Sequence, residues 1–208
     1  MSRRKGFTLV ELLIVIVVIG VLAAMMMFSS TEAISSAKAN NIVAGLTTFK
    51  EALIHWYTDN YDKVTTKDPN GKNDGIYRIS YKTSKGTWVH TLGDMMKNDS
   101  ASVTKYIGNV SQFNFSAKDF SSEAESGSYR FEDSGGVNKR SSWFVGYALS
   151  SSDKASGVAQ KLVGRAKSAH LLANQGTTGV KEGSTAKKQE ITPYAGGDVV
   201  WMKVLDFK

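Results

Sequence analysis

The first 60 residues carry two hydrophobic patterns in succession, and the first is a long apolar run. Residues Phe7–Phe28 form 22 consecutive positions with one charged side chain, Glu11. As a helix rising about 1.5 Å per residue, this run would be roughly 33 Å long, which is enough to cross the ~30 Å hydrocarbon core of a bilayer once. The β-branched stretch Ile14–Ile19 does not oppose a helix there, because in lipid the backbone must satisfy its own hydrogen bonds. The run therefore predicts a transmembrane helix.

Beyond Phe28 the pattern becomes amphipathic without a residue that would break a helix. Residues 29–41 are mostly polar and contain no proline. Apolar residues then follow at steps of four, three, four and three, the spacing of one helix face. They are Ile42, Leu46, Phe49, Leu53 and Trp56. We therefore expect one helix from Phe7 to about Asn60, roughly 80 Å long, whose amphipathic continuation at 29–60 lies against a following domain.

Residues 61–208 have a different texture, rich in Ser, Gly, Lys, Thr and Asn, and are expected to form a globular head. Apolar residues at helical spacing predict a helix near 153–172, over Asp153–Leu172, with a break near Gly164. The predicted strands are Ile76–Tyr81, Thr87–Leu92, Tyr129–Glu132, Trp143–Leu149 and Val199–Phe207. Strands in series favour an antiparallel sheet with one face covered by the amphipathic half of the long helix. The expected fold class is α+β, in the form of a lollipop.

Charge orients the chain and limits its chemistry. Arg3, Arg4 and Lys5 precede the apolar run and no comparable cluster follows it, which places the N-terminus in the cytoplasm and the head outside. These three residues supply part of a net charge of +7. The remaining +4 is too small to indicate nucleic-acid binding by itself. The sequence has no cysteine, which excludes a disulfide scaffold, a thiolate metal site and a cysteine nucleophile.

Three interpretations compete for the apolar run. It could be a signal peptide cleaved after Ala24, a plain single-pass anchor, or a segment kept on the mature protein after cleavage between Gly6 and Phe7. A carboxylate costs about 2.5–3.5 kcal/mol at the bilayer centre, and neither a signal peptide nor an inert anchor needs Glu11. Cleavage after Gly6 would give Phe7 a free amine four residues away, and with it a partner for the carboxylate.

The segment Lys5–Leu13, KGFTLVELL, resembles the processing and assembly motif of type IV pilins and type II secretion pseudopilins. The resemblance implies that a prepilin peptidase removes residues 1–6 and that the new amine of Phe7 becomes methylated. It also implies that Glu11 contacts the Phe7 amine of a neighbouring subunit. One position departs from many pilins, because Phe28 stands where they carry a proline, and only Gly20 is available to loosen the helix.

The resemblance also implies a location and partners. The precursor would be a single-pass protein of the inner membrane, and the mature subunit would lie in an extracellular pilus or a periplasmic pseudopilus. Its partners would be the prepilin peptidase, the pilus assembly platform, and copies of itself or of related pilins. We expect a structural subunit of a type IV pilus-like filament. Two alternatives stay open, a secretion pseudopilin and a pilus-borne adhesin or DNA-binding minor pilin.

The sequence shows no enzymatic motif, and we expect no catalytic residue, metal or cofactor. The histidines are His55, His90 and His170, and none has a second ligand at helical spacing. A calcium loop at Asp68–Gly75 does not fit, because Lys72 occupies a ligand position whether the loop starts at Asp68 or at Asn70. A membrane-tethered enzyme, which would act as a monomer and tolerate loss of Glu11, is the alternative of a different class.

Two features of the sequence bear on nucleic-acid binding. Aromatic residues near lysines could stack on bases, although the same pattern fits half-buried strands. These aromatics are Trp88, Tyr106, Trp143 and Tyr147, and a separate basic patch of Lys181, Lys187 and Lys188 has no aromatics within it. The sequence favours a solvated basic face and leaves the binding partner of the head open.

Overall fold

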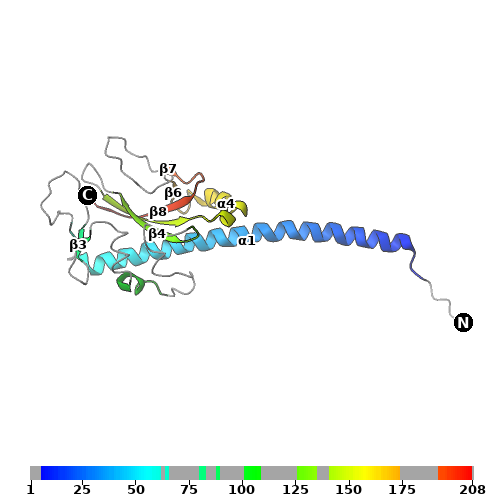
Figure 1. Cartoon of the computed structure of the whole chain (residues 1–208), viewed down its shortest axis with the longest axis horizontal. Coiled ribbons are helices and arrows are strands. Elements are labelled where there is room, and N and C mark those ends of the chain that lie inside the picture. Colours follow the sequence, from blue (N-terminus) through cyan, green and yellow to red (C-terminus); the bar gives the residue numbers. More distant parts are fainter. Residues whose placement is uncertain are drawn as a thin grey trace.

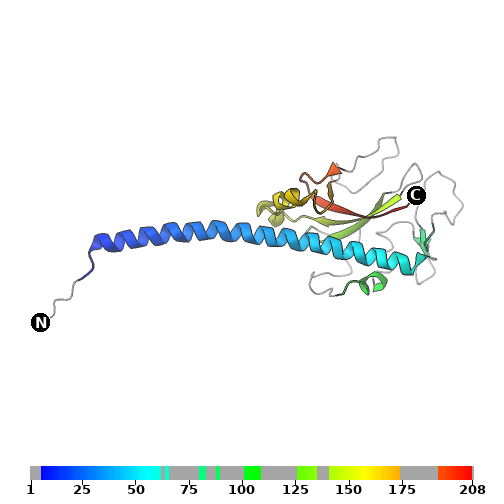
Figure 2. The same cartoon turned by 180° about the vertical axis from the view of Figure 1, so that it is seen from behind.

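A computed structural model describes residues 6–61, 64–65, 80–82, 88–89, 101–108, 126–134, 141–173 and 192–207. Figure 1 shows a long helix whose C-terminal half lies along the head and whose N-terminal half extends away from it. The view from behind in Figure 2 shows the same arrangement. The α+β lollipop expected from the sequence is therefore confirmed.

Helix α1 spans Leu9–Asp59, so it begins two residues later than expected and continues through the polar stretch without a break. The hydroxyls of Ser30 and Thr31 donate to the carbonyl oxygens of Met26 and Met27, one turn earlier, at 2.9 and 3.2 Å. The polar side chains at the end of the apolar run are thus satisfied within the helix. The apolar half of α1 and the half that packs on the head therefore belong to one continuous helix.

The main sheet of the head has five strands in the order β4-β5-β8-β6-β7, and the paired strands are antiparallel. Its strands are β4 (Tyr129–Ser134), β5 (Ser141–Ala148), β6 (Leu171–Ala173), β7 (Thr192–Pro193) and β8 (Val199–Phe207). Strands β4, β5 and β8 were predicted, whereas β6 and β7 were not. Their two or three residues are too few to give a periodic signal.

A second, three-stranded antiparallel sheet follows α1 in the order β1-β2-β3. Its strands are β1 (Val64–Thr65), β2 (Ser80–Lys82) and β3 (Trp88–Val89). Strands β2 and β3 fall at the predicted Ile76–Tyr81 and Thr87–Leu92, although residues 76–79, 87 and 90–92 lie outside the described part of the chain.

The helix expected over Asp153–Leu172 is confirmed in part, and its helical region ends at Arg165, beside the expected break at Gly164. The structure has two short helices instead of one, α3 (Ser151–Ala155) and α4 (Val158–Arg165), and residues 171–172 belong to β6. The interruption between the two falls at Gly157, whose φ of +80° lies in the left-handed region that glycine adopts without steric cost. Gly164 lies inside α4, with open space around the position of a Cβ.

The core forms where the amphipathic half of α1 meets the main sheet. The five predicted side chains of the apolar face, from Ile42 to Trp56, are at most 3% exposed. The ring of Phe49 lies 5.0 Å from that of Tyr129 on β4, measured between centroids. A Cβ at Gly45 would lie 2.1 Å from the Tyr129 hydroxyl oxygen, so only glycine permits this approach of sheet to helix. The packing confirms the predicted contact between α1 and the sheet.

Candidate functional site

The N-terminal half of α1 presents an apolar surface that no described part of the head covers. Its large apolar side chains from Phe7 to Met27 are between 50% and 87% exposed. Among the described residues α1 is the one helix long and apolar enough to cross a membrane. Its most apolar stretch of 18 residues is not buried against any described part of the chain. A surface of this extent is far larger than the apolar patches of ordinary monomers, so this half must be held in lipid or by other protein.

The start of α1 is organised by a capping box between Thr8 and Glu11. The Thr8 hydroxyl oxygen accepts from the Glu11 backbone N–H at 3.3 Å. In return, Glu11 Oε2 accepts from the Thr8 backbone N–H at 2.7 Å and from the Thr8 hydroxyl at 2.9 Å. The carboxylate therefore has hydrogen-bond donors within its own chain. The spacing Thr8-x-x-Glu11 before an apolar run is the sequence signal of such a capping box, and it was not among the predictions above.

Gly6 and Phe7 lie before the helix, in chain without regular secondary structure. Both residues are exposed, Phe7 to 87%, and a Cβ placed on Gly6 would meet nothing within 4 Å. The peptide bond between them is therefore not tied into helical hydrogen bonding. Among the predicted site residues, Phe7 and Glu11 are four residues apart at the start of α1, and this end of the helix points away from the head (Figure 2).

The other predicted candidates do not converge on a site. His55 lies exposed on α1, and His170 lies in the turn before β6. Within the part of the chain that the structure describes, no group of three or more His, Cys, Asp or Glu could hold a metal ion. His90, residues 68–75 and the basic patch Lys181, Lys187 and Lys188 fall outside it.

Two of the aromatic residues considered for base stacking belong to the core. Trp143 is 2% exposed and Tyr147 is 7% exposed, so neither offers a face to a nucleobase. Burial, followed by the adjacent Asp153 carboxylate, raises the pKa of Tyr147 to about 12. Tyr106 donates its hydroxyl to Asp59 Oδ2 at 2.7 Å. The stacking interpretation is therefore wrong for Trp143 and Tyr147.

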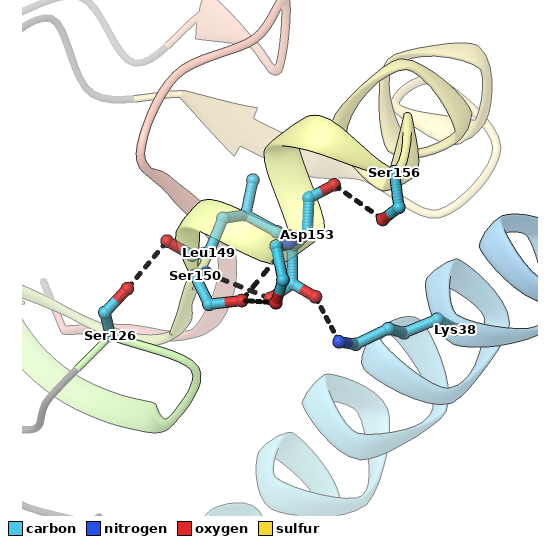
Figure 3. A network of polar contacts seen from close by, with 7 residues as sticks. Lys38, Ser126, Leu149, Ser150, Asp153 and Ser156 are labelled. Carbon is cyan, nitrogen blue, oxygen red and sulfur yellow. Dashed lines mark hydrogen bonds and ion pairs between the residues drawn. The ribbon is translucent and has the colours of Figure 1, made fainter.

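A buried ion pair that was not predicted from the sequence connects the head to α1 (Figure 3). Lys38 on α1 forms an ion pair with the fully buried carboxylate of Asp153 on α3. Asp153 also caps α3, because its Oδ2 accepts from the Ser150 backbone N–H at 2.9 Å. Burial raises the pKa of Asp153, but hydrogen bonds from Lys38 and Ser150 outweigh it and hold that pKa below its ordinary value. The spacing Ser150-x-x-Asp153 is the signal that could have placed this helix start.

Fold and N-terminal segment together define a pilin-like subunit, with a head built on one half of a helix whose other half is apolar and uncovered. Residues 1–27 match the family model described as the prokaryotic N-terminal methylation motif. Over 120 residues the chain is 30% identical to Fimbrial protein Q of Moraxella bovis, an alignment that covers 49% of this chain and 76% of that protein. No solved structure matches the chain.

The chain belongs to the type IV pilin-like family. Membership indicates a pilin- or fimbrial-type structural subunit that assembles with copies of itself or of related pilins. The apolar helix and the methylation motif fit a membrane-anchored precursor.

Proposed function

We propose that this chain is a structural subunit of a type IV pilus-like filament, assembled through Phe7–Phe28 after cleavage between Gly6 and Phe7. The observation that carries the proposal is the uncovered apolar half of α1. In the precursor, lipid solvates these side chains. In a filament, the same side chains pack among identical helices, so leaving the bilayer does not expose them to water. The name of the relative, a fimbrial protein, favours a pilus.

The processing step uses the chain that precedes the helix. Arg3, Arg4 and Lys5 hold the leader on the cytoplasmic side of the membrane. Gly6 offers a peptidase an exposed peptide bond with no side chain on one flank. Removal of residues 1–6 leaves Phe7 as the new N-terminus, which is then methylated.

Glu11 has a different partner in each state of the subunit. Alone in the membrane, its carboxylate accepts from Thr8, which lowers the cost of placing an acidic group at the edge of the apolar run. In the filament, the carboxylate gains the Phe7 amine of a neighbouring subunit. A charge-assisted hydrogen bond of this kind is roughly twice as strong as a neutral one, and it favours one axial register between helices.

Two substitutions separate the capping role of Glu11 from its charge. Glutamine also serves in a capping box, whereas alanine does not, so Glu11→Gln is the matched control for Glu11→Ala. We expect both variants to be processed normally and both to lose filaments, as measured by the pilin recovered in a sheared surface fraction. Normal filament yield from Glu11→Gln would refute the proposed use of the charge.

N-terminal mass spectrometry of the protein from its native cell tests the cleavage directly. We expect a mature chain that starts at methylated Phe7. A chain starting at Met25 would instead show that the segment is a signal peptide cleaved after Ala24. A bulky Gly6→Trp precursor should fail to shorten, whereas Gly6→Ala should be processed better, and normal processing of Gly6→Trp would contradict cleavage at this bond.

A secretion pseudopilin is the second candidate, favoured by one feature of the helix. Phe28 replaces the proline of many pilins, and α1 runs through this position without interruption. Deletion of the gene distinguishes the two. Loss of surface filaments with normal protein secretion supports the pilus, and a secretion defect without loss of surface filaments supports the pseudopilus.

A further inference from the structure

The short helices α3 and α4 lie at the end of the head that faces the uncovered half of α1, and both views agree on this (Figures 1 and 2). An ion pair fixes their position along α1, because Lys161 Nζ on α4 lies 2.6 Å from Glu32 Oε1. Glu32 is four residues beyond Phe28, which is about 6 Å along the helix axis. The end of the head is therefore within a few ångströms of the point where the apolar run stops.

This end of the head is basic. The segment 150–173 contains Lys154, Lys161, Arg165 and Lys167 against one acidic residue, Asp153. Asp153 is neutralised by Lys38 of α1, while Lys154 and Lys161 have the acidic partners Asp198 and Glu32.

Two of these cations are left uncompensated. Among the described residues, neither Arg165 nor Lys167 takes part in an ion pair, and Lys167 is exposed. Val163, two residues before Arg165, is 39% exposed. Lys167 is thus an exposed cation, whereas Arg165 is half-buried and its Nη1 is buried without a hydrogen-bond partner. This end of the head carries unpaired positive charge and one exposed apolar side chain.

The depth of this face matches a particular layer of the membrane. The hydrocarbon core of a bilayer is about 30 Å thick, and the bilayer with its headgroups is about 40–45 Å, so each headgroup layer is about 5–7 Å deep. With the apolar run in the core, Glu32 and the ammonium group of Lys161 lie within that layer. The partners at this depth are phospholipid headgroups, and a basic face selects the anionic ones.

We propose that the α3–α4 end of the head binds the headgroups of anionic phospholipids while the subunit is anchored in the membrane, before it joins a filament. The proposal rests on the membrane-anchored precursor described under the proposed function. Binding through α4 would hold the head upright on the bilayer surface. Each basic residue near an anionic surface strengthens the contact about fivefold, and salt weakens it.

A site-directed label tests the contact in the full-length chain. The chain has no cysteine, so Gly164→Cys gives a single labelling site on α4 in a position with free space around it. Gly108→Cys is the matched control, because it also has free space and follows Tyr106, which contacts Asp59 at the C-terminal end of α1. Each nitroxide-labelled protein is reconstituted into vesicles of phosphatidylcholine alone or of phosphatidylcholine with phosphatidylglycerol, and the access of a water-soluble relaxation agent is measured.

We expect the label at 164 to be protected in the anionic vesicles, to lose protection in high salt, and to be accessible in phosphatidylcholine. The label at 108 should be accessible throughout. Arg165→Gln with Lys167→Gln should lower the ratio of protected to accessible label about 25-fold, whereas Lys105→Gln should leave it unchanged.

Three results would overturn the proposal. They are equal access at position 164 in both lipids, equal protection in both lipids, and protection that follows the protein-to-lipid ratio instead of lipid charge. Flotation of the vesicles separates this failure from failure of the proposed function. A chain that floats with both kinds of vesicle but shows no lipid-dependent protection refutes the headgroup contact alone, and a chain that floats with neither refutes the membrane anchor.

Discussion

Replacing Lys38 by methionine removes the cation that faces the buried Asp153 carboxylate while keeping a similar apolar stem. Breaking a fully buried ion pair costs about 3–5 kcal/mol, because it leaves an uncompensated charge. The Lys38 side chain is 43% exposed, so water already screens its half of the pair. We therefore expect Lys38→Met to lower the free energy of unfolding by about 1–3 kcal/mol near neutral pH.

The effect depends on pH in a defined direction. The pKa of Asp153 is held below its ordinary value in the folded chain, so the ionised form stabilises the fold above that value, and the stabilisation is lost as pH falls through the lowered pKa. Without Lys38, two of the causes that lower the pKa of Asp153 are lost, while burial still raises that pKa and Ser150 still lowers it. The deficit of the variant should therefore be largest at neutral pH and should shrink as the pH falls toward 4.

Urea unfolding of the full-length chain in detergent, followed by tryptophan emission, measures this difference. Trp56 on α1 and Trp143 on β5 are buried with ring centroids 6.3 Å apart, so their emission reports separation of the head from the helix. Lys161→Met is the matched control, since it breaks an exposed ion pair between the same two parts and should cost less. Equal losses in the two variants, or a Lys38→Met deficit that persists unchanged on acidification, would refute the reasoning.

Two further substitutions test the packing of the head on α1. Gly45→Ala would place a Cβ 2.1 Å from the Tyr129 hydroxyl oxygen and should destabilise the fold by about 1–3 kcal/mol in the same urea assay, whereas Gly164→Ala, in open space on α4, should be neutral or stabilising. Stability of Gly45→Ala equal to the unmodified chain would contradict the tight approach of sheet to helix. Phe49→Ala should cost about 3–5 kcal/mol by leaving a cavity among aromatic rings, and a loss below about 1 kcal/mol would show that α1 is not held by this core.

The elements predicted correctly are long ones, in which a hydrophobic pattern repeats over many residues. The apolar face from Ile42 to Trp56 was read correctly because its spacing repeats over four turns, and β8 (Val199–Phe207) was read correctly because nine residues give a clear strand signal. Strands β6 and β7 could not be predicted, since β6 pairs with β8 and β7 pairs with β6 over only two residues each.

The features that were not predicted are local caps, which involve few residues, and one contact between residues far apart in the chain. The interruption at Gly157 was not predicted, because the Ser150 capping box starts a helix too short for a hydrophobic period to identify. Glu11 was singled out from its charge in the apolar run and from the motif KGFTLVELL, whereas its hydrogen bonds to Thr8 follow from local capping. The pair Lys38–Asp153 joins residues 115 positions apart, and no spacing rule connects them.

Strand β8 comes after the other described strands in chain order, yet it lies between β5 and β6 in the sheet. A ribosome delivers it after the rest of the sheet, so β4 can pair with β5 and β6 with β7, but the two pairs cannot join until Val199–Phe207 arrives between them. Until that moment the apolar face of α1 lacks much of its cover, and contacts of such long sequence separation form slowly. A chain that ended before Val199 would therefore leave the β4–β5 and β6–β7 pairs unjoined and part of the apolar face of α1 uncovered.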